Sequence, residues 1–215
     1  MMTKIRVLVV DDHPFFRCGV VEWLNQQSEL GCCGEAHSVL TARQAAAQTS
    51  PDVVLLDLQL SDGDGLDLCQ ELSDAYPSLR IIILSHRDED VYAHRALRAG
   101  ARGYVMKSEA TETVLAAIQT VMRGDIYTSR PVGARALQNL FPDPASSAPA
   151  LARLSNREIQ VFQMLGAGCG NREISAVLRI SQKTVETYRE HLKQKLRLPD
   201  TAALIQAARQ WVEQG

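Results

Sequence analysis

Ile5-Arg6-Val7-Leu8-Val9-Val10-Asp11-Asp12 is the stretch that decides the fold, because a short apolar run ends there on two acids. Val53-Val54-Leu55-Leu56-Asp57 has the same form further along the chain. Three more short runs are Gly31–Ala36, Arg80–Leu84 and Gly103–Met106. Runs rich in Val, Ile and Leu that do not alternate with polar residues are typical of strands buried on both faces of a parallel sheet.

The segments between these runs have the periodicity of amphipathic helices, with apolar residues three or four positions apart on one face. Such faces are formed by Val20, Val21 and Leu24, by Leu68 and Leu72, and by Val114, Ile118 and Val121. Five strand–helix units in residues 4–124 predict an α/β domain, in which helices cover both faces of a doubly wound, five-stranded parallel sheet.

A change of composition marks a second domain. Residues 125–150 include Pro142-Asp143-Pro144-Ala145-Ser146-Ser147-Ala148-Pro149 and lack apolar periodicity, which predicts a linker. Residues 151–215 contain four helical segments, so we expect an all-α domain there. From residue 150 onward, ten Lys and Arg face six Asp and Glu, whereas the preceding residues hold thirteen against nineteen. The positive C-terminal part favours a polyanionic partner.

The cysteines and the apolar runs indicate where the protein works. Five cysteines without C-x-x-C or zinc-ligand spacing indicate reduced thiols in a cytoplasmic protein. The run Val7–Val10 is too short for a signal peptide, and no run reaches the roughly 18 apolar residues of a membrane span. We therefore expect a cytoplasmic protein without membrane contact.

Acidic residues and a lysine follow the predicted strands. Asp11 and Asp12 end the first strand, Asp57 ends the third, and Lys107 follows the fifth. Because the carboxyl ends of parallel strands share one edge, these side chains are expected to meet. Clustered carboxylates repel each other unless a cation intervenes, and Mg²⁺ prefers oxygen ligands. Such a site suits a phosphoryl group, with Asp57 as the nucleophile.

Each of these residues also has a structural interpretation. Asp12 or His13, which precedes Pro14, is able to cap the first helix, and Asp57 is able to serve as a turn residue. It is their joint arrival at strand ends that favours a functional site.

At this point the chain resembles the response-regulator receivers over about residues 4–124. The residues that carry the resemblance are Val9-Val10-Asp11-Asp12-His13-Pro14, Asp57-Leu58 with Gly65, Ser85, and Tyr104-Val105-Met106-Lys107. The resemblance implies a flavodoxin-like receiver fold and phosphorylation of Asp57 by a sensor histidine kinase. It also implies Mg²⁺ held by Asp12 and Asp57, with Asp11 nearby and a backbone carbonyl from Gln59. Ser85, Tyr104 and Lys107 take the positions of the switch residues.

One departure from that family follows the phosphoacceptor. Receivers usually have Met-Pro where this chain has Leu60-Ser61. Without proline the φ angle of this turn is no longer fixed, so we expect altered loop mobility and altered phosphorylation kinetics. Charged residues near Ser85, among them Arg87, are expected to influence how long the phosphoryl group lasts.

The C-terminal domain has the signals of a helix-turn-helix. Ser155 and Glu158 form a capping box, Gly168 and Gly170 flank the end of the first helix, and Asn171 begins the next. Ser181 then opens a helix whose outward face is charged. Its predicted DNA contacts are Lys183, Thr184, Glu186, Thr187, Arg189, Glu190 and Lys193, with Lys195 and Arg197 as further phosphate contacts.

These signals resemble the LuxR-type helix-turn-helix over about residues 151–213. The match rests on Leu154-Ser155-x-Arg157-Glu158, Gly168-x-Gly170-Asn171-Arg172-Glu173-Ile174, Ile180-Ser181-x-x-Thr184-Val185 and Lys195-Leu196. With the receiver, it identifies the chain as similar to the NarL/FixJ response regulators. The resemblance implies a transcription regulator that binds double-stranded DNA as a homodimer on activation. Glu186 stands where many relatives have lysine. We therefore expect Glu186 either to read a base or to make no contact with the DNA.

Three alternatives stay open at this point. Leu204 and Trp211 on the last helix belong either to the core or to a dimer interface, which an exposed side chain would favour. A doubly wound phosphotransferase or phosphatase would share the acids, but no G-x-x-x-x-G-K-[ST] loop is present and position 59 is Gln59 rather than a second acid. An orphan regulator would ignore phosphate, against which the retained acids and Lys107 argue.

Overall fold

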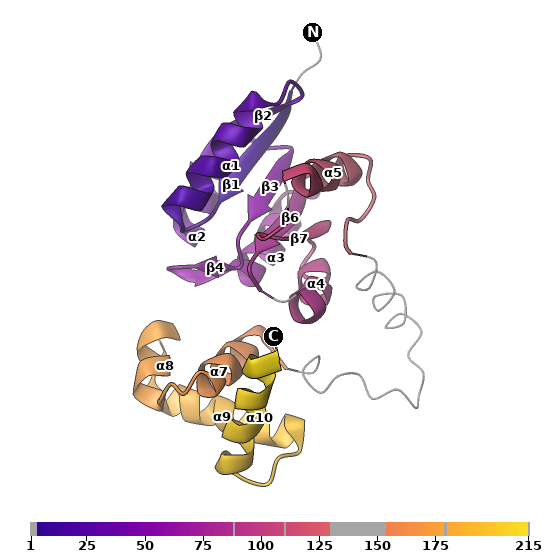
Figure 1. The fold of residues 1–215 in the computed structure, drawn as a ribbon. Helices are drawn as coiled ribbons and strands as arrows, with labels where there is room; N and C mark the ends of the chain where they lie inside the picture. Colours follow the sequence, from indigo (N-terminus) through magenta and orange to yellow (C-terminus); the bar gives the residue numbers. More distant parts are fainter. Residues whose placement is uncertain (1–3, 88, 110, 130–153, 179, 215) are drawn as a thin grey trace. The chain divides into compact units, whose positions relative to one another are not determined.

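The computed structural model describes residues 4–87, 89–109, 111–129, 154–178 and 180–214. The chain divides into two compact units, Met1–Leu140 and Phe141–Gly215 (Figure 1). Most of the predicted linker, from residue 130 to residue 150, lies outside the described residues.

The first unit contains the predicted five-stranded parallel sheet. Its strands are β1 (Ile5–Val10), β2 (Leu30–Ala36), β3 (Val53–Leu56), β6 (Arg80–Ser85) and β7 (Gly103–Met106). They lie in the order β2-β1-β3-β6-β7, and every neighbouring pair is parallel. The chain leaves β1 first toward one edge and later toward the other, so the crevice where ligands bind in such sheets lies between β1 and β3.

Helices cover both faces of this sheet, as the alternating strands and helices predict (Figure 1). Side chains of α1 and α5 pack with Val7, Val9 and Leu55 in one core cluster. The intervening side chains, such as Leu8 and Leu56, are also buried and point to the other face. The helices among the described residues of this unit are α1 (Pro14–Gln26), α2 (Val39–Thr49), α3 (Gly65–Ala75), α4 (Glu89–Arg98) and α5 (Thr111–Met122).

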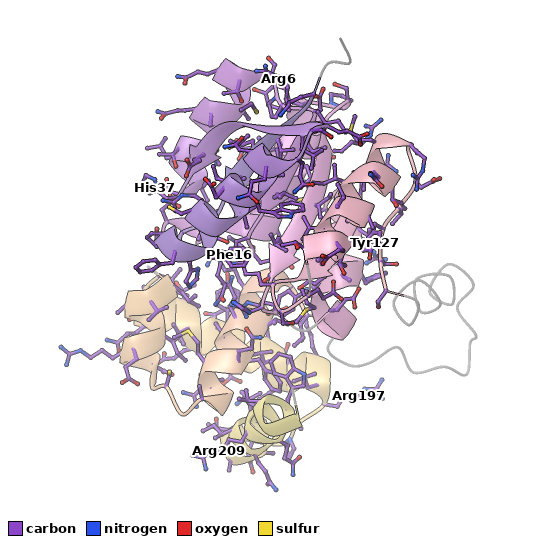
Figure 2. All side chains as sticks on the ribbon, turned by 45° about the horizontal axis from the view of Figure 1, so that its top comes forward. Arg6, Phe16, His37, Tyr127, Arg197 and Arg209 are labelled. Atoms are coloured by element: carbon purple, nitrogen blue, oxygen red, sulfur yellow. The ribbon has the colours of Figure 1, made fainter. Side chains whose placement is uncertain are left out.

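A second, two-stranded antiparallel sheet was not predicted. It consists of β4 (Gln59–Leu60) and β5 (Gly63–Asp64), which follow β3 directly. The strands are too short for a periodicity signal, and only pairing between them defines them. This hairpin lies at the carboxyl edge of the main sheet. In Figure 2 the label Phe16 marks this edge, and the label Arg6 marks the opposite edge, where β1 begins.

In the second unit, residues 154–178 and 180–214 form a bundle of four helices, as predicted. These are α7 (Asn156–Gly166), α8 (Asn171–Leu178), α9 (Gln182–Leu196) and α10 (Thr201–Gln214). The capping box is confirmed, because Ser155 accepts from the amide of Glu158 while the Glu158 side chain accepts from that of Ser155. Gly168 has φ of +85°, which is the left-handed exit that glycine permits after a helix.

The last helix packs into the core of this unit. Leu204 is 0% exposed, and the rings of Trp211 and Phe162 have centroids 5.7 Å apart. Leu204 therefore stabilises the bundle itself, whereas Trp211 packs against Phe162 and is still partly exposed. Within the described residues, no helix is both long and apolar enough to cross a membrane.

Candidate functional site

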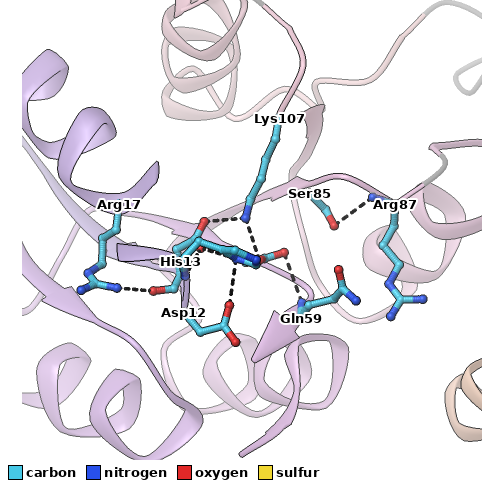
Figure 3. A network of polar contacts seen from close by, with 9 residues as sticks. Asp12, His13, Arg17, Gln59, Ser85, Arg87 and Lys107 are labelled. Carbon is cyan, nitrogen blue, oxygen red and sulfur yellow. Dashed lines mark hydrogen bonds and ion pairs between the residues drawn. The ribbon is translucent and has the colours of Figure 1, made fainter. Parts of the chain in front are cut away.

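Acidic side chains from β1 and β3 meet at the crevice between these strands (Figure 3). Asp11 and Asp57 are both 2% exposed. One potential ligand atom from each of Asp11, Asp12, His13 and Asp57 lies within 4.8 Å of the others. The β1 and β3 strands position the acids, because Val10 and Leu56 are paired and each is followed at once by an acid.

Lys107 completes this cluster from the end of β7. Its ammonium nitrogen lies 2.6 Å from Asp11 Oδ2 and 2.7 Å from Asp57 Oδ2, and its side chain is only 1% exposed. It also lies 4.6 Å from the centre of the Phe16 ring, which shields it from water. A buried ammonium between two buried carboxylates offsets part of their repulsion.

Burial dominates the electrostatics of Asp57. It raises the pKa of this carboxyl above its ordinary value, although the hydrogen bond from Lys107 opposes the change. The amide of Gln59 donates to Asp57 Oδ1 at 3.2 Å. The ionised form of Asp57 is therefore unfavourable at this buried position, and an added cation would stabilise it.

The residues of the cluster fit a divalent cation. Asp12 Oδ1 is buried and accepts no hydrogen bond, although His13 Nδ1 lies 2.9 Å away. A buried carboxylate oxygen that accepts no hydrogen bond is well suited to act as a ligand of a cation. The capping interpretation is not supported for His13, which occupies the N-cap of α1 without a side-chain capping bond.

Two residues that organise this cluster, Arg17 and His13, had no predicted role in it. Arg17 donates to the backbone carbonyl of Asp11 at 2.7 Å and to Glu35 at 3.2 Å, so it fixes the turn that carries Asp11 and Asp12. His13 turns its ring toward the acids instead of capping α1. Their position just after the two acids, at the N-cap and in the first turn of α1, is the signal that could have identified them.

The three expected switch residues belong to β6, β7 and the position after it: Ser85 ends β6, Tyr104 lies within β7, and Lys107 follows β7. Ser85 is fully buried, and its hydroxyl accepts from the amide of Arg87 at 3.2 Å. Tyr104 is 1% exposed, and its hydroxyl donates to the carbonyl of Arg87 at 2.7 Å. Burial raises the pKa of Tyr104. Arg87 in turn donates to the hydroxyl of Tyr92 on α4 at 3.0 Å, which links the loop after β6 to that helix.

The predicted DNA-binding residues lie along α9 in two groups. Lys183, Glu186, Thr187 and Glu190 are exposed to solvent, whereas Thr184, Arg189 and Lys193 are partly buried.

The partly buried group makes contacts within the unit. The Thr184 hydroxyl lies 2.7 Å from that of Ser181, Arg189 donates to Asn171 of α8, and Lys193 pairs with Glu190 at 2.8 Å.

Lys195 is exposed, but its ammonium group pairs with a side chain of α7. Its ammonium lies 2.7 Å from the buried carboxylate of Glu158. Burial alone would raise the pKa of Glu158, but the hydrogen bonds from Lys195 and Ser155 outweigh it and lower the pKa. This pair fastens α9 to the start of α7 and so orients the helix that carries the charged face.

Both units match known families. Residues 7–119 match the response regulator receiver domain, and residues 152–208 match the family described as bacterial regulatory proteins, luxR family. The chain belongs to the LuxR-type response regulators.

Individual relatives support this assignment. The chain is 33% identical to the oxygen regulatory protein NreC of Staphylococcus carnosus, over 95% of this chain and 96% of that protein. A LuxR-family two-component response regulator from Aurantimonas sp. SI85-9A1 is 26% identical, with a TM-score of 0.59 over 65% of this chain and 99% of its own. RcsB of Salmonella typhimurium shares the fold, at 24% identity and a TM-score of 0.72 over 97% and 98% of the two chains. This LuxR-type response regulator is therefore a transcription regulator and not a phosphotransferase.

Proposed function

We propose that this response regulator receives a phosphoryl group on Asp57 from a sensor histidine kinase and then binds double-stranded DNA as a homodimer through α9. The observation that carries the proposal is the cluster at the crevice, where Lys107 lies 2.7 Å from the buried carboxylate of Asp57 beside the acids of β1. A carboxylate that is held in place and close to a buried ammonium is arranged for phosphoryl transfer.

In the proposed reaction a carboxylate oxygen of Asp57 attacks the phosphorus of a phosphohistidine. The new oxygen–phosphorus bond forms as the nitrogen–phosphorus bond breaks, and the electron pair stays on the imidazole of the kinase. Asp12 and Asp57, with Asp11 nearby and the Gln59 carbonyl, would hold Mg²⁺, which neutralises charge on the phosphoryl oxygens when bound. Lys107, 2.7 Å from Asp57 Oδ2, supplies a second positive charge.

The phosphoryl group adds about 1.5 to 2 negative charges at a buried position. In the proposal Lys107 follows this charge, and the Ser85 hydroxyl leaves the amide of Arg87 to donate to a phosphoryl oxygen. The Tyr104 hydroxyl is hydrogen-bonded to the carbonyl of the same Arg87, whose side chain is hydrogen-bonded to Tyr92 of α4. A shift of Ser85 therefore changes the contacts of Arg87 with both tyrosines. The altered surface near α4 and α5 favours dimerisation.

The second helix of a helix-turn-helix enters the major groove and presents its N-terminal half to the bases. The proposed contacts are the residues predicted from the sequence, with Lys183, Glu186 and Thr187 toward the bases because they are exposed in that half of α9. Glu186 is proposed to accept from a cytosine amino group, a contact that selects a base without gripping the backbone.

The first experiment treats the protein with acetyl phosphate and Mg²⁺ and follows Asp57 by mass spectrometry, dimerisation by sizing and DNA binding by gel shift. Asp57→Ala should abolish all three responses, whereas the exposed control Asp74→Ala should leave them intact. Equal dimerisation and DNA affinity with and without the phosphoryl group would refute the switch, and would leave an orphan regulator that binds DNA regardless of phosphate.

A second experiment tests Glu186 alone. Glu186→Ala should relax the preference at one position of the binding site, at a cost of about 1–3 kcal/mol on the preferred sequence. Tighter binding to all sequences alike would show that Glu186 only repels phosphate.

A further inference from the structure

The loop after Asp57 contains the Leu60-Ser61 departure, and its structure shows what stands in for the missing proline. Leu60 pairs with Gly63, so Ser61 and Asp62 form the tip of the β4–β5 hairpin. Ser61 is the second residue of this four-residue turn, the position at which proline presets φ. With serine there, the turn needs another constraint.

Asp62 forms that constraint with a neighbouring helix. Its carboxylate accepts from the amide of Val39 at 2.7 Å and from that of Leu40 at 3.2 Å. These are the first two amides of α2, which its own N-cap Ser38 leaves to others, because Ser38 accepts from Thr41. A Cβ atom at Gly63 would lie 2.8 Å from Cγ2 of Val39, so the turn is pressed against α2.

The other end of the loop is fastened beside the phosphoacceptor. Asp64 accepts from the amide of Leu66 at 2.8 Å and so caps α3. The amide of Gly65 donates to the Leu58 carbonyl at 3.1 Å, and a Cβ atom at Gly65 would lie 2.4 Å from the Asp57 carbonyl oxygen. Between these anchors, Gln59 is within hydrogen-bond distance of the Asp57 carboxylate. A loop released at its tip would therefore displace Gln59 relative to Asp57.

We propose that Asp62 is a positioning residue, which takes over the role of the usual proline by tying the Gln59 loop to the N-terminus of α2. This inference rests on the proposed function, because it concerns the site where Asp57 is phosphorylated. In this proposal Asp62 acts on the site through the backbone of Gln59. Proline limits a turn within its own residue, whereas Asp62 limits it through a second element of the fold.

The test compares four variants by two readouts that do not depend on phosphorylation. These are the amide hydrogen exchange of Gln59 without Mg²⁺, and the Mg²⁺ dissociation constant from amide chemical shifts. Asp62→Ala should accelerate exchange at Gln59 and weaken Mg²⁺ binding about fivefold, the order of effect of a lost helix cap. Ser61→Pro in the Asp62→Ala background should restore both values to within about twofold, and Ser61→Pro alone should change little.

Ser38→Ala is the matched control, because it removes the other cap of the same helix without releasing the loop. It should lower the urea midpoint as Asp62→Ala does, while Gln59 exchange and Mg²⁺ binding stay within about twofold of wild type. The inference is overturned if Ser38→Ala and Asp62→Ala alter both readouts equally, or if Ser61→Pro fails to restore them. Failure of acetyl phosphate to modify the wild-type chain would instead overturn the proposed function, and the Gln59 exchange would still decide the role of Asp62.

Discussion

Replacement of Gly65 by alanine should disturb the phosphoacceptor without adding or removing a charge. A Cβ atom at Gly65 would lie 2.4 Å from the Asp57 carbonyl oxygen and 2.6 Å from the Leu58 Cα, which are both backbone atoms and cannot swing aside. Ordinary contact begins at 3.4 Å, so the end of β3 and the start of α3 must separate by about 1 Å. Overpacking of this kind costs about 1–3 kcal/mol, or about 3–10 °C in the melting temperature of a unit of this size.

Gly19→Ala provides the control with the opposite sign. Gly19 lies inside α1, and a Cβ atom there would meet nothing within 4 Å. The added methyl should therefore stabilise the helix by about 0.5–1 kcal/mol.

The assay is thermal unfolding by circular dichroism, with acetyl phosphate labelling of Asp57 measured well below the transition. Gly65→Ala should melt earlier and label more slowly, whereas Gly19→Ala should melt later and label at the wild-type rate. The steric argument is wrong if both variants have the same sign of effect, or if Gly65→Ala stays within about 0.5 kcal/mol of wild type.

Three further outcomes are expected. Without divalent cations, Asp57→Asn should raise stability toward urea at pH 7, because burial raises the pKa of Asp57 and its ionised form opposes folding. The gain in stability should vanish as the pH falls to the ordinary pKa of 3.8. A constant gain across that pH range would contradict this cause. Burial raises the pKa of Cys69 to about 12, so a thiol reagent at pH 8 should label the exposed Cys18 at once and Cys69 only after unfolding; equal labelling rates in the native protein would refute this. Lys195→Met should destabilise the helical unit by about 1–3 kcal/mol at pH 7. The loss of stability should shrink below pH 4.5 as Glu158 takes up a proton. Urea titrations at several pH values measure this loss, and a pH-independent loss would show that the pair has no role.

Local patterns were sufficient for the main elements. The unbroken apolar runs predicted the strands because a parallel sheet buries both faces of each strand. The acids of the site were predictable for a related reason, since each directly follows a strand and parallel strands end at one edge. The capping box at Ser155 and the exit at Gly168 are also local, because all of their partners lie within a few residues.

The contacts that tune the site join elements distant in the chain. Asp62 caps a helix that begins 23 positions earlier, Lys195 is 37 positions from Glu158, and Tyr104 is 17 positions from its acceptor in Arg87. No periodicity distinguishes these residues from solvated surface residues, and the hairpin at Gln59–Asp64 is too short to leave a pattern.

The amino-acid sequence by itself determined the class of the fold, the place of the acidic cluster and the helix-turn-helix, because burial and capping act over a few residues. Only the tertiary structure decided that Leu204 belongs to the core, that Lys195 pairs with Glu158, and that Asp62 contacts the start of α2 from the loop beside Asp57. The reason is that these contacts depend on how the packed elements are oriented. The local sequence around a residue is the same whether its element turns that residue toward a neighbouring element or toward solvent.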